Sequence, residues 1–181
     1  CRVITIYIIS KHLPNRRIAE IDDFGSSFFC GSTFFRECCM YRVEAYEGIG
    51  ELLQFLKSQG IFIAVLSNKP HPRTLDNVQG VFGKGYFDLV YGEREDKGIK
   101  KKPCPDGVWA IAEELGLSKS EILYLGDTNT DMETGNNAKV DTVGVTWGFR
   151  TREELMAFHP ALIADHPSQV VQYIKDVNGI E

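Results

Sequence analysis

From about residue 46 to the C-terminal end, hydrophobic positions follow two alternating patterns. One is a short continuous apolar run, as in IFIAVLSN (61–68), which is typical of a strand buried on both faces. The other places apolar residues three or four positions apart, as in GIGELLQFLKSQG (48–60), which is typical of an amphipathic helix. The alternation of the two patterns predicts a parallel sheet flanked by helices.

The rest of this region repeats the alternation. Further strands are predicted over 88–92, 122–126, 142–147 and 162–165. Further helices are predicted over 72–80, 105–116, 130–138, 151–158 and 167–177. The string SKSE (118–121) has the form of a capping box and predicts a short helical turn before the third strand. Five strands with their crossovers predict an α/β fold with a doubly wound, Rossmann-like parallel sheet.

Residues 1–45 do not continue this pattern. VITIYII (3–9) resembles a buried strand, but a charged stretch and then an aromatic and cysteine-rich stretch follow it without a helical or strand period. The chain therefore divides into an irregular part over 1–45 and an α/β core over 46–181.

Composition narrows the class of protein. The 181 residues carry 20 basic and 25 acidic side chains, a net charge of −5, so we expect no nucleic-acid partner. No apolar run approaches the roughly 20 residues that span a bilayer, so we expect no membrane segment. The five cysteines show no CxxC pairing, which favours reduced thiols and a cytoplasmic protein. Nothing distinguishes a monomer from a homodimer.

Polar residues follow several of the predicted strands. In open α/β sheets, ligands bind beyond the carboxyl ends of the strands. Ser67 and Asn68 follow one apolar run, Asp127 follows another, and Lys102 lies in the loop before a helix. We expect these side chains to face one crevice.

Asp127 and Asp131 are four residues apart where a strand gives way to a helix. Two carboxylates on one crevice repel each other unless a cation lies between them, and their oxygens are the ligands that Mg²⁺ prefers. The alternative is structural: Asp127 caps the helix and Asp131 is a solvated acid in its first turn.

Ser67 and Lys102 are candidates for binding phosphate. A serine hydroxyl donates a hydrogen bond to a phosphate oxygen, and a lysine supplies a compensating positive charge. Alternatively, Ser67 is a turn residue and Lys102 is one surface lysine among several, although the two prolines of KKPCPD (101–106) restrict the loop that presents it.

Together, VLSNKP (65–70), KKPCPD (101–106), LGDTNTDMETGNNA (125–138) and TVGVTWGFR (142–150) resemble the haloacid dehalogenase (HAD) superfamily, in particular its phosphoglycolate phosphatase-like branch. The resemblance implies a HAD-type core and Mg²⁺-dependent hydrolysis of a small phosphorylated metabolite through an aspartyl-phosphate. It also implies roles for five residues. Ser67, Asn68 and Lys102 would bind the substrate phosphate, and Ser67 and Lys102 would also be catalytic. Asp127 would be a magnesium ligand, and Asp131 would support it in the metal site.

The family's nucleophile is an aspartate in a D-x-D-G-T/S motif that ends the first core strand, and this chain has no copy of that motif. IDDFGS (21–26) offers Asp22 or Asp23 as substitutes, but the spacing differs and no buried strand precedes it. The segment around it resembles part of the family's helical cap, in truncated or degenerate form. We therefore expect that the nucleophile strand lies upstream of Cys1 or has been lost.

Two other functions stay open. A non-catalytic remnant or pseudoenzyme would keep the magnesium and phosphate site without the nucleophile. A phosphomutase or dehalogenase would use the same fold, although a dehalogenase of this superfamily needs no metal and the acidic motif argues against it.

Overall fold

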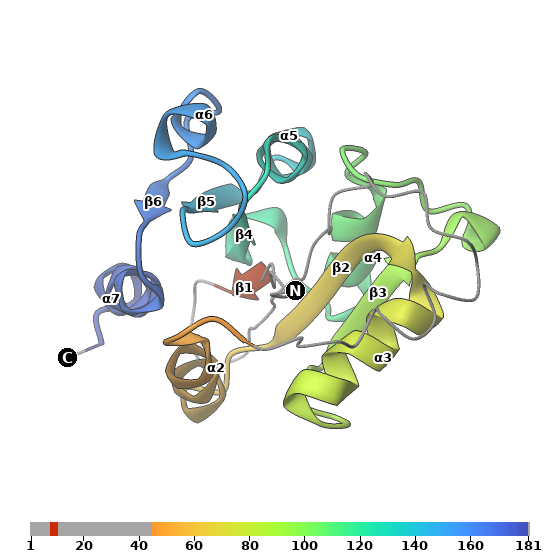
Figure 1. Ribbon diagram of the computed structural model, residues 1–181, viewed down its shortest axis with the longest axis horizontal. Helices are drawn as coiled ribbons and strands as arrows, with labels where there is room; N and C mark the ends of the chain where they lie inside the picture. The colour runs from red at the N-terminus through yellow and green to blue at the C-terminus, as the bar shows by residue number, and fades with distance from the viewer. Residues whose placement is uncertain (1–7, 11–44, 181) are drawn as a thin grey trace.

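The computed structural model describes residues 8–10 and 45–180. Their centre is a six-stranded sheet in the order β3-β2-β1-β4-β5-β6 (Figure 1). The strands are β1 (Ile8–Ser10), β2 (Ile63–Pro70), β3 (Leu89–Glu93), β4 (Ile122–Gly126), β5 (Asp141–Val145) and β6 (Leu162–Ala164). The five strands predicted from the hydrophobic pattern are therefore all present, and the predicted α/β fold is confirmed.

The central strand departs from the parallel arrangement. Pairings β2–β3, β4–β5 and β5–β6 are parallel, as predicted, whereas β1 is antiparallel to both of its neighbours, β2 and β4. β1 comes from the VITIYII stretch that resembled a buried strand. The predictions for Asp22, Asp23 and a cap segment concern residues outside the described ranges.

Six α-helices and two 3₁₀ turns surround the sheet in the described part of the chain. The α-helices are α2 (Ile49–Ser58), α3 (His71–Phe82), α4 (Asp106–Glu114), α5 (Asn129–Ala138), α6 (Arg152–Met156) and α7 (Pro167–Asn178). A 3₁₀ turn η2 (Lys119–Glu121) lies where the capping box predicted it, and the Glu121 carboxylate accepts a hydrogen bond from the Ser118 N–H (2.8 Å). A second 3₁₀ turn, η1 (Glu95–Lys97), follows β3. No helix of the described residues is both long and apolar enough to cross a bilayer.

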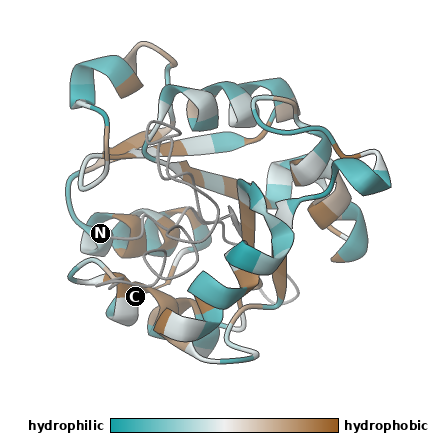
Figure 2. Ribbon diagram, turned by 45° about the vertical axis from the view of Figure 1, so that its right-hand side comes forward, coloured by the Kyte–Doolittle hydropathy of each residue, from teal (hydrophilic) through white to brown (hydrophobic). Residues whose placement is uncertain are grey.

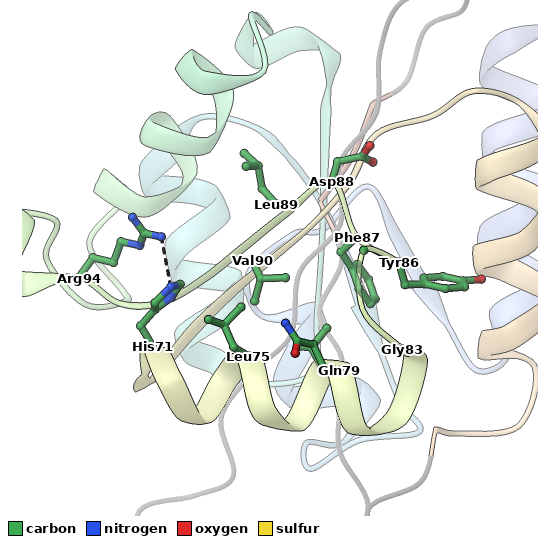
Figure 3. Close-up of a pocket in the computed structure, with 12 residues that line it drawn as sticks. His71, Leu75, Gln79, Gly83, Tyr86, Phe87, Asp88, Leu89, Val90 and Arg94 are labelled. Carbon is green, nitrogen blue, oxygen red and sulfur yellow. Dashed lines mark hydrogen bonds between the residues drawn. The ribbon is translucent and has the colours of Figure 1, made fainter.

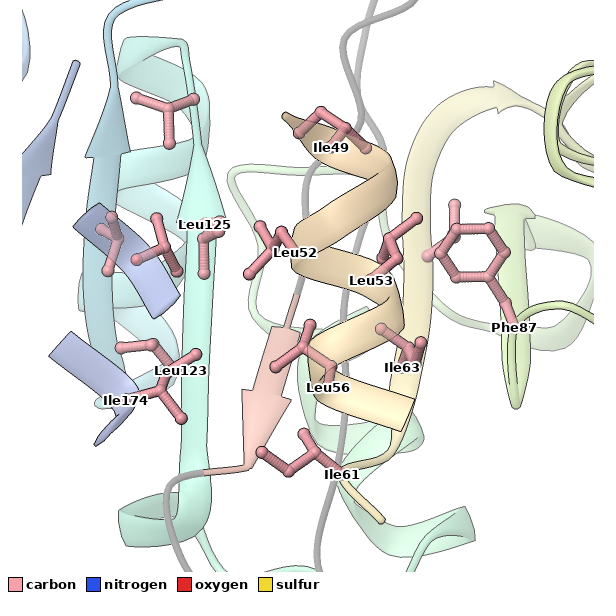
Figure 4. Packing of buried hydrophobic residues seen from close by; sticks show 14 of the residues in the cluster. Ile49, Leu52, Leu53, Leu56, Ile61, Ile63, Phe87, Leu123, Leu125 and Ile174 are labelled. Atoms are coloured by element: carbon pink, nitrogen blue, oxygen red, sulfur yellow. The ribbon is translucent and has the colours of Figure 1, made fainter. Parts of the chain in front are cut away.

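The hydrophobic core lies on both faces of the sheet. On one face, α2, α3 and α7 pack against β2, β4 and β5 in a cluster that includes Leu53, Leu56, Ile63 and Leu123 (Figure 4). On the other face, α4 packs on β2 and β4 around residues such as Ile111. In Figure 2 the strands carry much of the hydrophobic colour, whereas the helices change colour along their length. Because both faces of the sheet are buried, the strands appear in the sequence as continuous apolar runs.

Leu53 tests the contribution of this core. Its side chain is fully buried at the interface of α2 with the sheet. We expect Leu53→Ala to lower the free energy of unfolding by about 3 kcal/mol, because it removes buried methyl groups and leaves a cavity. Chemical denaturation measures the change. Val177→Ala on the exposed side of α7 is the control, and an equal loss in both variants would contradict this account of the core.

Candidate active site

The predicted site residues lie near the carboxyl ends of β2 and β4 and in the loop before α4. Asp127 directly follows β4, and α5 begins two residues later with Asp131 in its first turn. Ser67 and Asn68 lie in β2 where its pairing with β3 is interrupted between Leu66 and Pro70. A small hollow is lined by Ser67, Asn68 and Lys102 together. The structure thus brings the two strand ends and the lysine loop into one crevice.

The Lys102 ammonium forms an ion pair with the Asp131 carboxylate. The Nζ to Oδ1 distance is 3.1 Å, and both side chains are completely buried. Removing two charges from water costs several kcal/mol per ion, so each charge is tolerated only because the other lies within hydrogen-bonding distance. The interpretation of Lys102 as a surface lysine is therefore wrong, and so is that of Asp131 as a solvated acid.

Asn68 fixes the loop that carries Lys102. Its Oδ1 accepts a hydrogen bond from the Lys102 N–H (2.8 Å), and its Nδ2 donates one to the Lys102 carbonyl (3.1 Å). One side-chain amide therefore holds both main-chain polar groups of the lysine. The sequence suggested phosphate binding for Asn68, a role that stays a prediction. Its observed partner is a residue 34 positions away, and no local sequence pattern reveals that contact.

The second oxygen of Asp131 belongs to a capping box. Its Oδ2 accepts hydrogen bonds from the Thr128 N–H (3.0 Å) and from the Thr128 hydroxyl, while the Asp131 N–H donates to Thr128 Oγ1 (3.2 Å). Thr128, and not Asp127, is thus the N-cap of α5. Both Asp131 oxygens have partners, which fixes the carboxylate that holds Lys102.

Asp127 is buried with one oxygen unpaired. Its Oδ2 accepts a hydrogen bond from the Phe149 N–H (2.8 Å), but Oδ1 has no partner among the described residues. Burial, reinforced by the nearby negative charge of Asp131, raises the pKa of Asp127 to about 7, against the opposing effects of the Phe149 N–H and Lys102. A carboxylate in these surroundings requires a cation to stay ionised.

Two glycines allow the chain to pack against these carboxylates. A Cβ on Gly126 would lie 2.2 Å from Cβ of Asp131, and a Cβ on Gly148 would lie 2.2 Å from Oδ2 of Asp127. Neither position tolerates a side chain without displacement of a site carboxylate. The glycine immediately before Asp127 is thus explained by the close approach of α5.

The donor set fits a hard divalent cation. Asp127 offers a buried carboxylate oxygen without a hydrogen-bond partner among the described residues, with the Asp131 carboxylate close enough to raise its pKa. Among the described residues no three His, Cys, Asp or Glu side chains come together. Mg²⁺ suits such a site because it usually keeps several waters and takes one or two carboxylates plus a substrate phosphate.

Ser67 presents a hydroxyl to the same crevice. The side chain is buried, and its Oγ accepts a hydrogen bond from the Lys69 N–H (3.1 Å). That bond uses an oxygen lone pair and leaves the hydroxyl hydrogen able to donate. A phosphate oxygen at this point would receive it.

The WGFR loop (147–150) forms part of the site, and the sequence did not predict this contact. The main chain after Trp147 closes over Asp127, with Phe149 N–H on its carboxylate and Arg150 N–H on its carbonyl (3.2 Å). The available signal was the glycine at 148 after a predicted strand, because glycine allows close backbone approach. The Phe149 side chain stays half exposed at the rim.

The chain is similar to known proteins over more than half of its length. The model of the haloacid dehalogenase-like hydrolase family matches residues 34–145, more than half of the chain. A phosphoglycolate phosphatase of Pectobacterium atrosepticum is 32% identical over 126 residues, which are 70% of this chain and 53% of that protein. A pyrophosphatase of Listeria welshimeri is 27% identical over 131 residues, 72% of this chain and 59% of its own length.

The fold has a close counterpart among solved structures. A Lactobacillus delbrueckii protein, provisionally assigned as a phosphoglycolate phosphatase, superposes with a TM-score of 0.72 at 29% identity. The match covers 81% of this chain and 59% of that protein. The chain thus spans little more than half the length of the relatives it matches.

The buried ion pair makes a testable contribution to stability. Lys102→Met leaves the Asp131 carboxylate buried without its cation, so we expect the free energy of unfolding to fall by about 3 kcal/mol at pH 8. Lys101→Met is the matched control, because the neighbouring Lys101 pairs with Glu93 at the exposed surface. Urea denaturation of both variants measures the difference. Equal stability of the two variants would show that the pair contributes nothing.

The raised pKa of Asp127 predicts that the stability of the metal-free protein depends on pH. Its pKa is about 7 in the folded state and 3.8 as an ordinary aspartate, so the folded state binds the proton more tightly. The contribution of Asp127 to the free energy of unfolding is therefore greatest below about pH 4 and is lost as the pH rises through 7. We expect Asp127→Asn to be more stable than the wild type at pH 8, by about 2 to 4 kcal/mol.

Thermal and urea unfolding between pH 5 and pH 8 in the presence of a chelator test this expectation. Glu133→Gln, at an exposed position of the neighbouring helix α5, controls for the loss of one negative charge. Parallel stability profiles for the wild type and Asp127→Asn would contradict the raised pKa.

Proposed function

The chain belongs to the haloacid dehalogenase-like hydrolase family, and from this premise we propose that it acts in Mg²⁺-dependent hydrolysis of a small phosphomonoester. The observation that carries the proposal is a buried Lys102–Asp131 ion pair beside the unpaired Asp127 Oδ1. The ion pair presents a buried ammonium to the crevice, and Asp127 Oδ1 has no hydrogen-bond partner among the described residues. Both have a purpose if a cation and a phosphate enter the crevice.

The net charge of the crevice residues supports the proposed role of Mg²⁺. Asp127, Asp131 and Lys102 together carry one net negative charge when ionised, so a phosphate dianion alone would be repelled. A divalent cation on Asp127 makes the total positive and reverses the sign of that interaction. When bound, Mg²⁺ would supply charge stabilisation to the phosphoryl oxygens.

The residues of the crevice have separate roles. The Ser67 hydroxyl donates a hydrogen bond to a phosphoryl oxygen. The Lys102 ammonium, held by Asp131 and by the Asn68 clamp on its main chain, neutralises negative charge on the phosphoryl group. Asp127 holds the metal. Because these groups are buried and already oriented, little reorganisation is required when charge develops in the transition state.

The proposed reaction proceeds through an aspartyl-phosphate. An aspartate carboxylate attacks phosphorus and expels the alcohol, and water then hydrolyses the acyl phosphate to release orthophosphate. Asp22 and Asp23, the substitutes considered for this nucleophile, lie outside the residues that the structure describes.

We infer a small substrate of the phosphoglycolate type, acted on in the cytoplasm by a monomer or homodimer. The phosphoglycolate phosphatase of Pectobacterium atrosepticum supports this substrate class, and the Listeria welshimeri pyrophosphatase makes pyrophosphate the competing substrate. A non-catalytic protein that retains the magnesium and phosphate site is the second candidate. The lack of a D-x-D-G-T/S motif in this chain favours it.

Hydrolysis and binding assays separate the two candidates. Phosphoglycolate, pyrophosphate and p-nitrophenyl phosphate are incubated with the chain, with Mg²⁺ or with a chelator. For an active enzyme we expect Mg²⁺-dependent turnover and a loss of about 100-fold or more in kcat/KM for Lys102→Met, because that variant removes transition-state charge stabilisation. Lys101→Met, one residue away at the surface, should retain activity.

Calorimetric titration with Mg²⁺, alone and with orthophosphate, reports the site without turnover. Binding that Asp127→Asn abolishes, in a chain that hydrolyses none of the three substrates, would support the non-catalytic candidate. A folded chain that neither binds Mg²⁺ nor hydrolyses any of these substrates would contradict both candidates.

A further inference from the structure

A groove lies between helix α3 and the edge strand β3 (Figure 3), and Arg94 lines both this groove and the hollow beside Ser67 and Lys102. Its volume is about 320 Å³, at the lower end of the range for small-molecule sites. His71 and Arg94 lie side by side at one end. The rest of the lining combines the polar side chains of Gln79, Tyr86 and Asp88 with an apolar set: Leu75, Val78, Phe87, Leu89 and Val90.

The imidazole of His71 faces a hydrogen-bond donor at each nitrogen. Its Nδ1 lies 3.2 Å from the Gly92 nitrogen, whose N–H points at it, and its Nε2 lies 3.4 Å from Arg94 Nη2. A main-chain N–H and a guanidinium can only donate. A neutral imidazole has one acceptor nitrogen and one N–H, so it satisfies one of these neighbours and directs a hydrogen at the other.

Protonation does not resolve the conflict, because an imidazolium has no acceptor at all. Burial and the positive charges of Arg94 and Lys97 lower the pKa of His71, against a smaller opposing effect of Asp96. His71 is therefore neutral at pH 7. If Nδ1 accepts from Gly92, then His71 Nε2–H and the Arg94 guanidinium converge as two donors that lack a shared acceptor.

Arg94 is held in place by an aromatic ring. Its guanidinium stacks on the Tyr91 ring, with Cζ 4.2 Å from the ring centroid. Its Nε is buried and has no hydrogen-bond partner within the described ranges, and no carboxylate in those ranges forms an ion pair with it. A fixed, uncompensated guanidinium next to an imidazole N–H is a suitable binding group for an anion.

The close approach of β3 to α3 is required by the sequence. A Cβ on Gly92 would lie 2.4 Å from Cα of His71 and 2.7 Å from Oγ1 of Thr74. Glycine at this position thus brings the main-chain N–H to the imidazole ring. The orientation of His71 is consequently set by the packing of two elements and not by a flexible surface loop.

We propose that this groove binds a small monocarboxylate with a short apolar or aromatic tail. A carboxylate oxygen accepts from His71 Nε2–H and from the Arg94 guanidinium, while the tail packs between Leu75 and Val90. A monoanion is preferred over a phosphate dianion because Arg94 supplies one positive charge and His71 is neutral. An occupant would lie beside the end of β2, four residues after Ser67.

Titration with benzoate, followed by amide and imidazole NMR signals, tests the proposal in the whole chain. We expect saturable shifts at Leu75, Val90 and the His71 ring, which line the groove and not the hollow beside Ser67. Benzyl alcohol has a similar shape without the charge and should bind about tenfold more weakly or worse. Arg94→Gln should weaken benzoate binding by about tenfold or more, and Lys175→Gln on α7, which removes a charge elsewhere on the molecule, by less than about twofold.

Several results would overturn the proposal. They are shifts only at Ser67 and Lys102, equal binding of benzyl alcohol, or no shift in the groove up to about 20 mM benzoate. If Arg94→Gln does not fold, the comparison of benzoate with benzyl alcohol in the wild type decides the role of the charge. Leu75→Trp, which fills the apolar end, must then abolish benzoate binding. Because benzoate carries no phosphate, none of these outcomes depends on the proposed phosphatase activity.

Discussion

The ion pair between Lys102 and Asp131 is the constraint around which the crevice is organised. Two fully buried charges 3.1 Å apart stabilise each other only while both positions are held, so every neighbouring element contributes to holding them. Thr128 fixes the carboxylate through the capping box of α5, and Asn68 fixes the main chain of the lysine. The pair therefore ties together the loops after β2 and β4 and the loop before α4.

Asp127 is the site residue whose hydrogen bonding this arrangement leaves incomplete. Its neighbour Asp131 is already neutralised by Lys102, and its own Oδ1 has no partner among the described residues. Burial makes such a carboxylate unfavourable in its ionised form, and a bound divalent cation would offset this cost. The proposed metal binding would thus oppose structural stability at Asp127, as is common where a site is built to take a charged ligand.

Predictions from the sequence were most accurate where burial imposes a repeating pattern. Five strands were identified because both faces of the sheet are covered, and the turn at Ser118–Glu121 was identified from its capping box. The central strand β1 was recognised as strand-like, but not its antiparallel pairing, since a short apolar run has the same composition in either direction. Asn68 was assigned to the site, whereas its hydrogen bonds to the Lys102 main chain were not foreseen.

What the sequence determined by itself was the fold class, the family resemblance and the identity of the polar residues at the strand ends. These follow from local periodicity and from the order of short motifs along the chain. The tertiary structure decided which of those residues are buried, that Lys102 neutralises Asp131 and not Asp127, and that Gly92 brings β3 against His71. Such features depend on contacts between residues more than 20 positions apart, and the free energy of a charge depends on burial that only the folded chain creates.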